Sequence, residues 1–217
     1  MSVLASKNFG LAKNSPVRFI LLVGLYLSLT YISNIILYDK EFLINLVGRD
    51  FENFLKVRKQ IDTFGYFLIP VFFLCKILLI SFILDFGCYL YGKEIDYKAL
   101  FGIVVKAEYI LLLPVLFKTI WFSYFQKNYD LKDLQLFYPL SLSNLVEYKD
   151  LGIWWIYPLQ IINVFEVFYW IILAYNLDKT LKTPENKNTG IKIVASSYGV
   201  GLLIWVISVM FFTLNLN

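Results

Sequence analysis

Long apolar runs dominate the hydrophobic pattern of this chain, and most charged residues fall between them. A transmembrane helix needs roughly 20 consecutive, mostly apolar residues. Five segments meet this requirement, so the pattern predicts an all-α fold, a polytopic transmembrane helical bundle with about five spans. The predicted spans are residues 16–38, 65–91, 98–125, 153–175 and 191–214.

The segment 40–62, between the first two predicted spans, has a different pattern. Its apolar residues recur at steps of three and four, which places them on one side of a helix and the charges on the other. These apolar residues are Leu43, Val47, Phe51, Phe54, Val57 and Ile61. Two interpretations of this amphipathic helix stay open: it packs over the end of the bundle, or it lies in the membrane interface.

Composition supports a membrane protein and excludes several other classes. Hydrophobic residues make up 59% of the 217 positions, well above the ~45–50% of soluble domains. The net charge of +4 is not gathered into one patch, which argues against a nucleic-acid surface. With no histidine and two cysteines, we expect no metal site and no cofactor. No internal repeat divides residues 1–217, so we expect a single membrane domain.

The charges that flank the first predicted span suggest an orientation. Lys7, Lys13 and Arg18 precede this span, whereas Asp39 and Glu41 follow it. Because basic residues favour the cytoplasmic side, we expect a cytoplasmic N-terminus and an outside C-terminus. The richness in Lys, Ile, Asn, Phe and Tyr suits an AT-rich bacterium, so the expected location is a bacterial inner membrane.

Ionisable groups inside predicted spans are costly, and each is a candidate functional residue. Counting depth along the helices places opposite charges from three helices in one layer. The candidate buried polar layer consists of Asp85, Lys106, Glu108, Asn163, Glu166 and Lys76. We expect Lys106 to pair with Asp85, Glu108 or Glu166, and we expect Lys118 to reach for the membrane surface. The layer either neutralises charge and holds the helices in register, or handles a proton or cation.

Catalytic motifs are absent from the sequence. It contains no phosphate-binding loop, no GxSxG and no HExxH, so we expect no enzymatic activity and no catalytic residue. The small residues of the segment Ser196–Gly201 are better explained by close helix packing than by a nucleophile.

Two segments resemble a known family. The run Gly102–Pro114 (GIVVKAEYILLLP) and the stretch Ile162–Trp170 (INVFEVFYW), followed by a basic loop and a last apolar span, resemble Yip1-domain membrane proteins. The resemblance implies five spans, a cytoplasmic N-terminus and a polytopic, non-enzymatic protein that works through partners.

These observations lead to two functional hypotheses. The first is a non-enzymatic scaffold or partner-binding subunit of a membrane complex, in contact with the lipid bilayer and with membrane-protein partners or further copies of itself. The second is a small transporter or an ion- or proton-handling subunit that uses the buried Lys/carboxylate layer.

Overall fold

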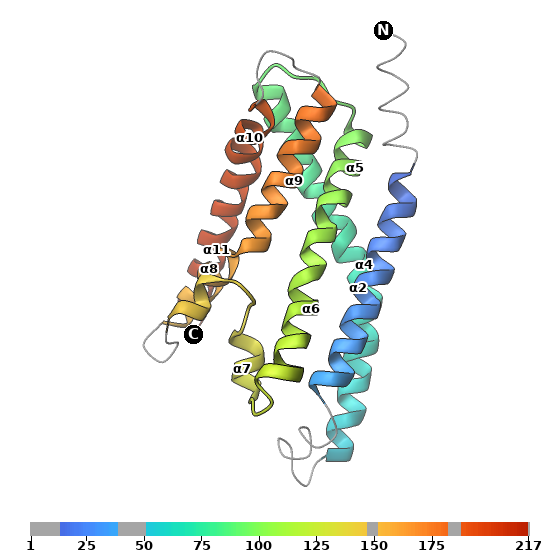
Figure 1. Ribbon diagram of the computed structural model, residues 1–217, viewed down its shortest axis with the longest axis vertical. Coiled ribbons are helices and arrows are strands. Elements are labelled where there is room, and N and C mark those ends of the chain that lie inside the picture. The colour runs from blue at the N-terminus through green and yellow to red at the C-terminus, as the bar shows by residue number, and fades with distance from the viewer. Residues whose placement is uncertain (1–13, 39–50, 147–151, 182–187, 217) are drawn as a thin grey trace.

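The structure, a computed structural model, describes residues 14–38, 51–146, 152–181 and 188–216. Within these residues every regular element is a helix, which confirms the predicted all-α class (Figure 1). Elements labelled η are short 3-10 turns (η2, η4) or π-turns (η3, η6). In chain order the elements are α2 (Ser15–Leu37), α4 (Phe51–Leu90), α5 (Tyr97–Glu108), η2 (Tyr109–Leu112), α6 (Leu113–Ile120), η3 (Trp121–Phe125), α7 (Leu131–Leu136), η4 (Leu142–Leu145), α8 (Ile153–Ile161), α9 (Val164–Leu181), α10 (Thr189–Val194), η6 (Ala195–Gly199) and α11 (Val200–Leu216).

Among the described residues, four helical segments are long and apolar enough to cross a membrane. They are Ser15–Leu37, Lys59–Leu90, Tyr97–Phe125 and Thr189–Asn215, and each overlaps one of the predicted spans. All four run along the long axis of the molecule (Figure 1). The segment Tyr97–Phe125 is 50% buried in its most apolar part, against 17–22% for the others. The helix formed by α5 and α6 therefore lies at the centre of the bundle, and the other three present more surface to lipid.

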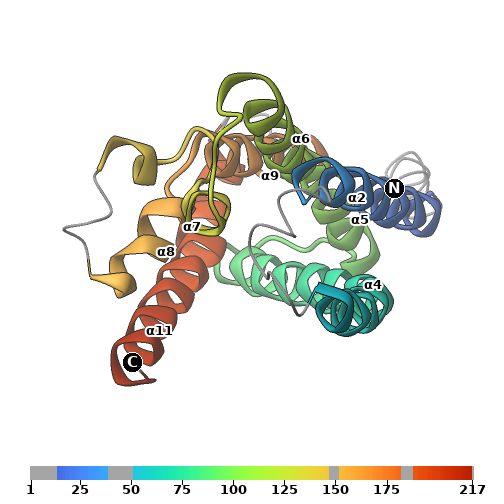
Figure 2. The ribbon, with the colours of Figure 1, turned by 90° about the horizontal axis from the view of Figure 1, so that it is seen from below.

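The predicted span 153–175 is not one continuous helix, and this prediction is wrong in that respect. The chain forms α8 and α9 instead, with a break at Ile162 and Asn163. The backbone there pairs with a distant segment: the Leu142 N–H donates to the Ile162 carbonyl at 3.0 Å, and the Val164 N–H donates to the Leu140 carbonyl at 3.1 Å. These tertiary hydrogen bonds take the place of helical ones. The helix before the break, α8, packs along α11 on the side of the molecule away from α2 (Figure 2).

The predicted amphipathic helix between the first two spans is not a separate element in its described part. Residues 51–62 continue directly into the second span, so α4 is a single helix of 40 residues. Val57 and Ile61 of the predicted stripe are 54% and 65% exposed, so this part does not pack over the bundle end. The positions 40–50, and the side chains of Phe51 and Phe54, lie outside the described residues.

The main hydrophobic core lies where α4, α5, α9 and α10 meet. Its fully buried members include Ile77, Ile103, Leu173 and Ile193, one from each of these helices. The expected packing role of Ser196–Gly201 is confirmed by close contacts between elements. A Cβ added to Gly87 of α4 would lie 2.6 Å from the Ser197 Cβ, so the Ser197 side chain of η6 packs directly on the backbone of α4.

Candidate functional site

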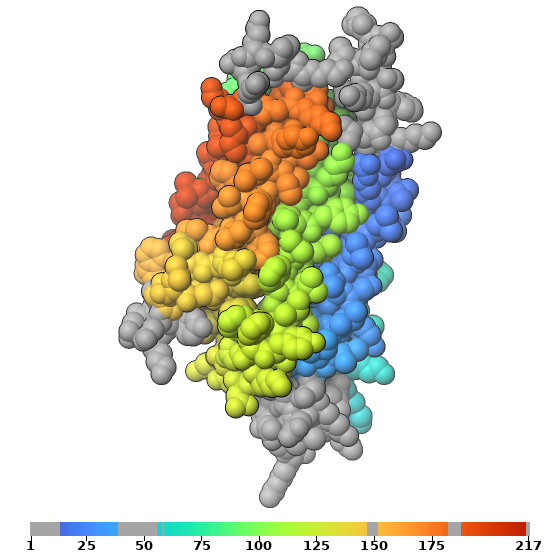
Figure 3. Space-filling model, viewed as in Figure 1, coloured from blue at the N-terminus to red at the C-terminus, as the bar shows by residue number. Residues whose placement is uncertain are grey.

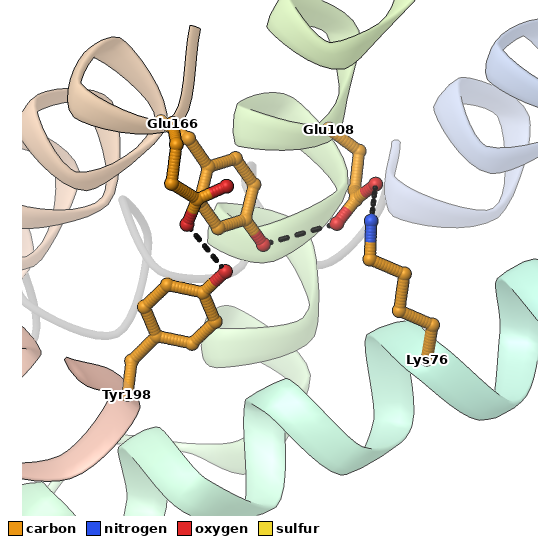
Figure 4. A network of polar contacts seen from close by, with 5 residues as sticks. Lys76, Glu108, Glu166 and Tyr198 are labelled. Carbon is orange, nitrogen blue, oxygen red and sulfur yellow. Dashed lines mark hydrogen bonds and ion pairs between the residues drawn. The ribbon is translucent and has the colours of Figure 1, made fainter. Parts of the chain in front are cut away.

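A fully buried carboxylate forms one centre of the polar network inside this bundle. Glu108, the last residue of α5, is 0% exposed. The Lys76 ammonium group on α4 donates to Glu108 Oε2 at 2.8 Å, and the Tyr169 hydroxyl on α9 donates to Glu108 Oε1 at 3.0 Å (Figure 4). The ion pair and the hydrogen bond together fix both carboxylate oxygens. Glu108 thus joins three helices at one point.

A second carboxylate, Glu166, forms the other centre of the network. It lies in the first turn of α9, where its Oε1 accepts hydrogen bonds from the Tyr198 hydroxyl at 2.8 Å and the Trp170 indole N–H at 3.0 Å. The ring of Tyr198 lies 5.4 Å from the ring of Tyr169, measured between centroids. The two tyrosines therefore connect Glu166 with Glu108 across the interior (Figure 4).

Charge is unevenly distributed in this network. Lys76 and Glu108 both act electrostatically on Glu166. Among the described residues Glu166 has no ion pair, and its Oε2 atom accepts no hydrogen bond. One lysine therefore compensates the charge of two carboxylates. The three groups carry a net charge of −1 when both carboxylates are ionised.

The expected pairing of Lys106 with a carboxylate of the layer is not found; the cation bonded to Glu108 is Lys76. The reason is the direction of the side chains around the helix. Lys106 and Glu108 are two positions apart, which separates them by about 200° around α5. Glu108 points into the core, whereas Lys106 is only half-buried and lies within electrostatic range of two other cations, Arg18 and Lys179.

Asp85 also lies outside the network. It is half-buried on α4 and has no ion pair or hydrogen bond among the described residues. Asp85 follows Lys76 by nine positions, or about two and a half helical turns, so the two side chains leave α4 on opposite sides.

Asn163 has a structural role next to the network. Its Oδ1 accepts a hydrogen bond from the Glu166 N–H at 2.8 Å, which is the pattern of a helix N-cap. Its side-chain amide donates to the carbonyls of Gln160 and Ile161 at 2.9 and 3.0 Å. Asn163 therefore satisfies the open backbone groups at the break and orients the first turn of α9, which contains Glu166.

The structure also shows the contacts of Lys118 and of three aromatic residues in the network. The Lys118 ammonium group donates to the Leu134 carbonyl in α7, which follows the end of the span Tyr97–Phe125. Tyr169, Trp170 and Tyr198 were not among the candidates, although they complete the network. A signal for two of them was present, because positions 166, 169 and 170 share one face of a helix. Among the described residues no group of three or more His, Cys, Asp or Glu side chains could hold a metal ion.

The fold and this network define a class: the chain is a helical membrane protein with an internal polar network that joins α4, α5, α9 and η6. Comparison with protein-family models, with curated proteins and with solved structures finds no match for this chain.

Proposed function

We propose that this protein is an ion-handling membrane subunit that binds and releases one proton at Glu166. The observation that carries the proposal is the unequal number of charges, one lysine against two carboxylates. An isolated ionised carboxylate within an apolar bundle is costly, and binding a proton removes the charge. One proton on Glu166 brings the group of Lys76, Glu108 and Glu166 from a net charge of −1 to zero.

The surroundings of Glu166 suit reversible proton exchange. Its ionised form is stabilised by two neutral donors, Tyr198 and Trp170, and by its place in the first turn of α9, where the helix dipole favours negative charge. Its protonated form places the proton on Oε2, which no described residue bonds. Both states therefore keep the existing hydrogen bonds at Oε1. Glu108 is unsuited to this role, because Lys76 neutralises it.

Infrared difference spectroscopy on the purified protein in liposomes tests this proposal. A change of pH should produce the C=O stretching band of a protonated carboxyl group, and Glu166→Gln should abolish it. Asp85→Asn is the matched control, since it removes a half-buried carboxyl outside the network. A band that persists in Glu166→Gln, or disappears in Asp85→Asn, would overturn the assignment to Glu166.

A second function, binding to a partner membrane protein, is supported by the length of α4. Its 40 residues extend over ~60 Å, about twice the ~30 Å thickness of the hydrocarbon core. The N-terminal part of α4 exposes Val57, Ile61 and Phe64 by 54–65%. These residues recur at steps of four and three, which suits contact with an apolar helix of a partner. The resemblance to Yip1-domain proteins supports the same proposal.

The two functions predict different results for a substitution in the exposed stripe formed by Val57, Ile61 and Phe64. Ile61→Asp should release a protein that co-purifies with wild type in mild detergent, and Gln60→Asp, at the exposed neighbouring position, should retain it. Equal recovery of the partner with both variants would refute the role of the stripe. The pH-dependent infrared band should be unchanged in Ile61→Asp, so a failure of one proposal is distinguishable from a failure of the other.

A further inference from the structure

Three basic side chains come from three neighbouring helices of the bundle. They are Arg18 on α2, Lys106 on α5 and Lys179 on α9, and both Arg18 and Lys179 act electrostatically on Lys106. The three helices lie side by side, with α5 between the other two (Figure 1). In the space-filling view α9, α5 and α2 form adjoining bands (Figure 3).

Contacts between α2 and α5 fix the level of this cluster. The Tyr109 hydroxyl donates to the Arg18 carbonyl at 2.8 Å, so the first turn of α2 is level with the end of α5. The 23 residues of α2 extend over ~34 Å, little more than the ~30 Å hydrocarbon core, so its first turn lies near the membrane surface. Lys106 therefore comes to headgroup level although it is well inside α5, and Lys179 lies in the last turn of α9.

The cluster lacks an anion among the described residues. The ion pair in the described part of the chain joins Lys76 and Glu108, and none of the three cations takes part in it. The Arg18 Nη1 atom is enclosed and has no hydrogen-bond acceptor. Lys179 lies 5.8 Å from the centroid of the Tyr175 ring, which stabilises a cation without neutralising it. Arg18 therefore has an open donor and acts on Lys106 without a described counter-ion, so this end of the three helices offers a place for an anion.

We propose that Arg18, Lys106 and Lys179 bind the phosphate group of an anionic lipid headgroup at the membrane-surface end of α2, α5 and α9. The arginine guanidinium presents parallel N–H donors that match two phosphate oxygens, and the lysines add point charges. Basic pockets between transmembrane helices at headgroup level are suited to phospholipid headgroups. A lipid fits better than a free phosphate ion because the face formed by the three helices adjoins the bilayer.

Native mass spectrometry of the full chain in detergent tests this site. We expect phosphatidylglycerol to bind in preference to phosphatidylcholine, which carries the same phosphate but no net charge. Each basic residue near a membrane surface contributes about fivefold to the binding of anionic lipid. Lys106→Gln and Arg18→Gln should each weaken phosphatidylglycerol binding by about this factor. Lys192→Gln, at an exposed position on α10, is the matched control and should leave the affinity unchanged.

Three results would overturn the proposal. The first is equal binding of the two lipids to wild type. The second is an unchanged affinity for phosphatidylglycerol in Lys106→Gln. The third concerns the source of the phosphate: inorganic phosphate that competes as well as phosphatidylglycerol would assign the cluster to a free anion and refute a lipid site.

Discussion

Removing the lysine that is paired with the buried Glu108 carboxylate should strongly destabilise the bundle. In Lys76→Met the carboxylate of Glu108, which is 0% exposed, loses its bonded cation and keeps the single hydrogen bond from Tyr169. Breaking a buried pair in this way costs about 3–5 kcal/mol of unfolding free energy, a change of roughly 150- to 5,000-fold in the folding equilibrium. The Lys76 side chain is 44% exposed, so we expect a loss of about 3 kcal/mol, at the lower end of that range.

A double-mutant cycle measures the pair itself. Glu108→Gln keeps an acceptor for the Tyr169 hydroxyl but removes the charge, so Lys76→Met combined with Glu108→Gln should be much more stable than Lys76→Met alone. The assay is unfolding in detergent with increasing SDS, followed by loss of helical circular dichroism. Residues in contact give coupling energies of about 0.5–3 kcal/mol. Lys106→Met combined with Glu108→Gln is the control and should give additive losses. Additivity for Lys76 and Glu108, or stronger coupling for Lys106, would refute the pairing.

Two further variants test the break before α9 and the hairpin between α9 and α10. Asn163→Ala removes the N-cap that bonds the Glu166 N–H; it should cost about 1 kcal/mol in the same unfolding assay. Gly190→Ala places a Cβ against the Ala174 carbonyl of the neighbouring helix, so we expect a loss of about 1–3 kcal/mol. Gly65→Ala is its control: nothing lies within 4 Å of the added Cβ, and the change should raise stability by about 0.5–1 kcal/mol. Equal effects of the two glycine changes would contradict the close approach.

The predicted and observed helices agree where apolar content alone decides the structure. Runs of about 20 apolar residues leave few alternatives to a helix, because every backbone polar group has to be bonded in lipid. The break at Ile162 and Asn163 was not predictable in this way. It depends on hydrogen bonds to residues 140–142, and no local pattern reveals partners that are 20 positions away. An apolar run thus predicts burial in the membrane more securely than it predicts a continuous helix.

The polar residues were predictable as a group, whereas their pairing was not. Glu108, Glu166 and Lys76 were candidates because ionisable residues inside apolar spans require partners. Depth counting favoured Lys106 as the cation, since it compares positions along the helix axes and ignores directions around them. The spacing of Lys106 and Glu108 already contained that information. Tyr198 gave no signal at all, because its contact with Glu166 depends on how α9 and η6 pack together.

The polar network lies where the helices depart from regular α geometry. Glu108 is followed by the 3-10 turn η2, Tyr198 belongs to the π-turn η6, and Glu166 follows the break at Asn163. A π-turn accommodates one more residue than an α-turn, so it turns the side chains beyond it by about 100° relative to a regular helix. In η6 the side chain of Ser197 packs on Gly87 of α4, and the side chain of Tyr198 reaches Glu166 of α9. One short segment thereby packs tightly on one neighbour and donates a hydrogen bond to another. Irregular turns of this kind are common at functional sites, and their position here supports the proposal that Glu166 exchanges a proton.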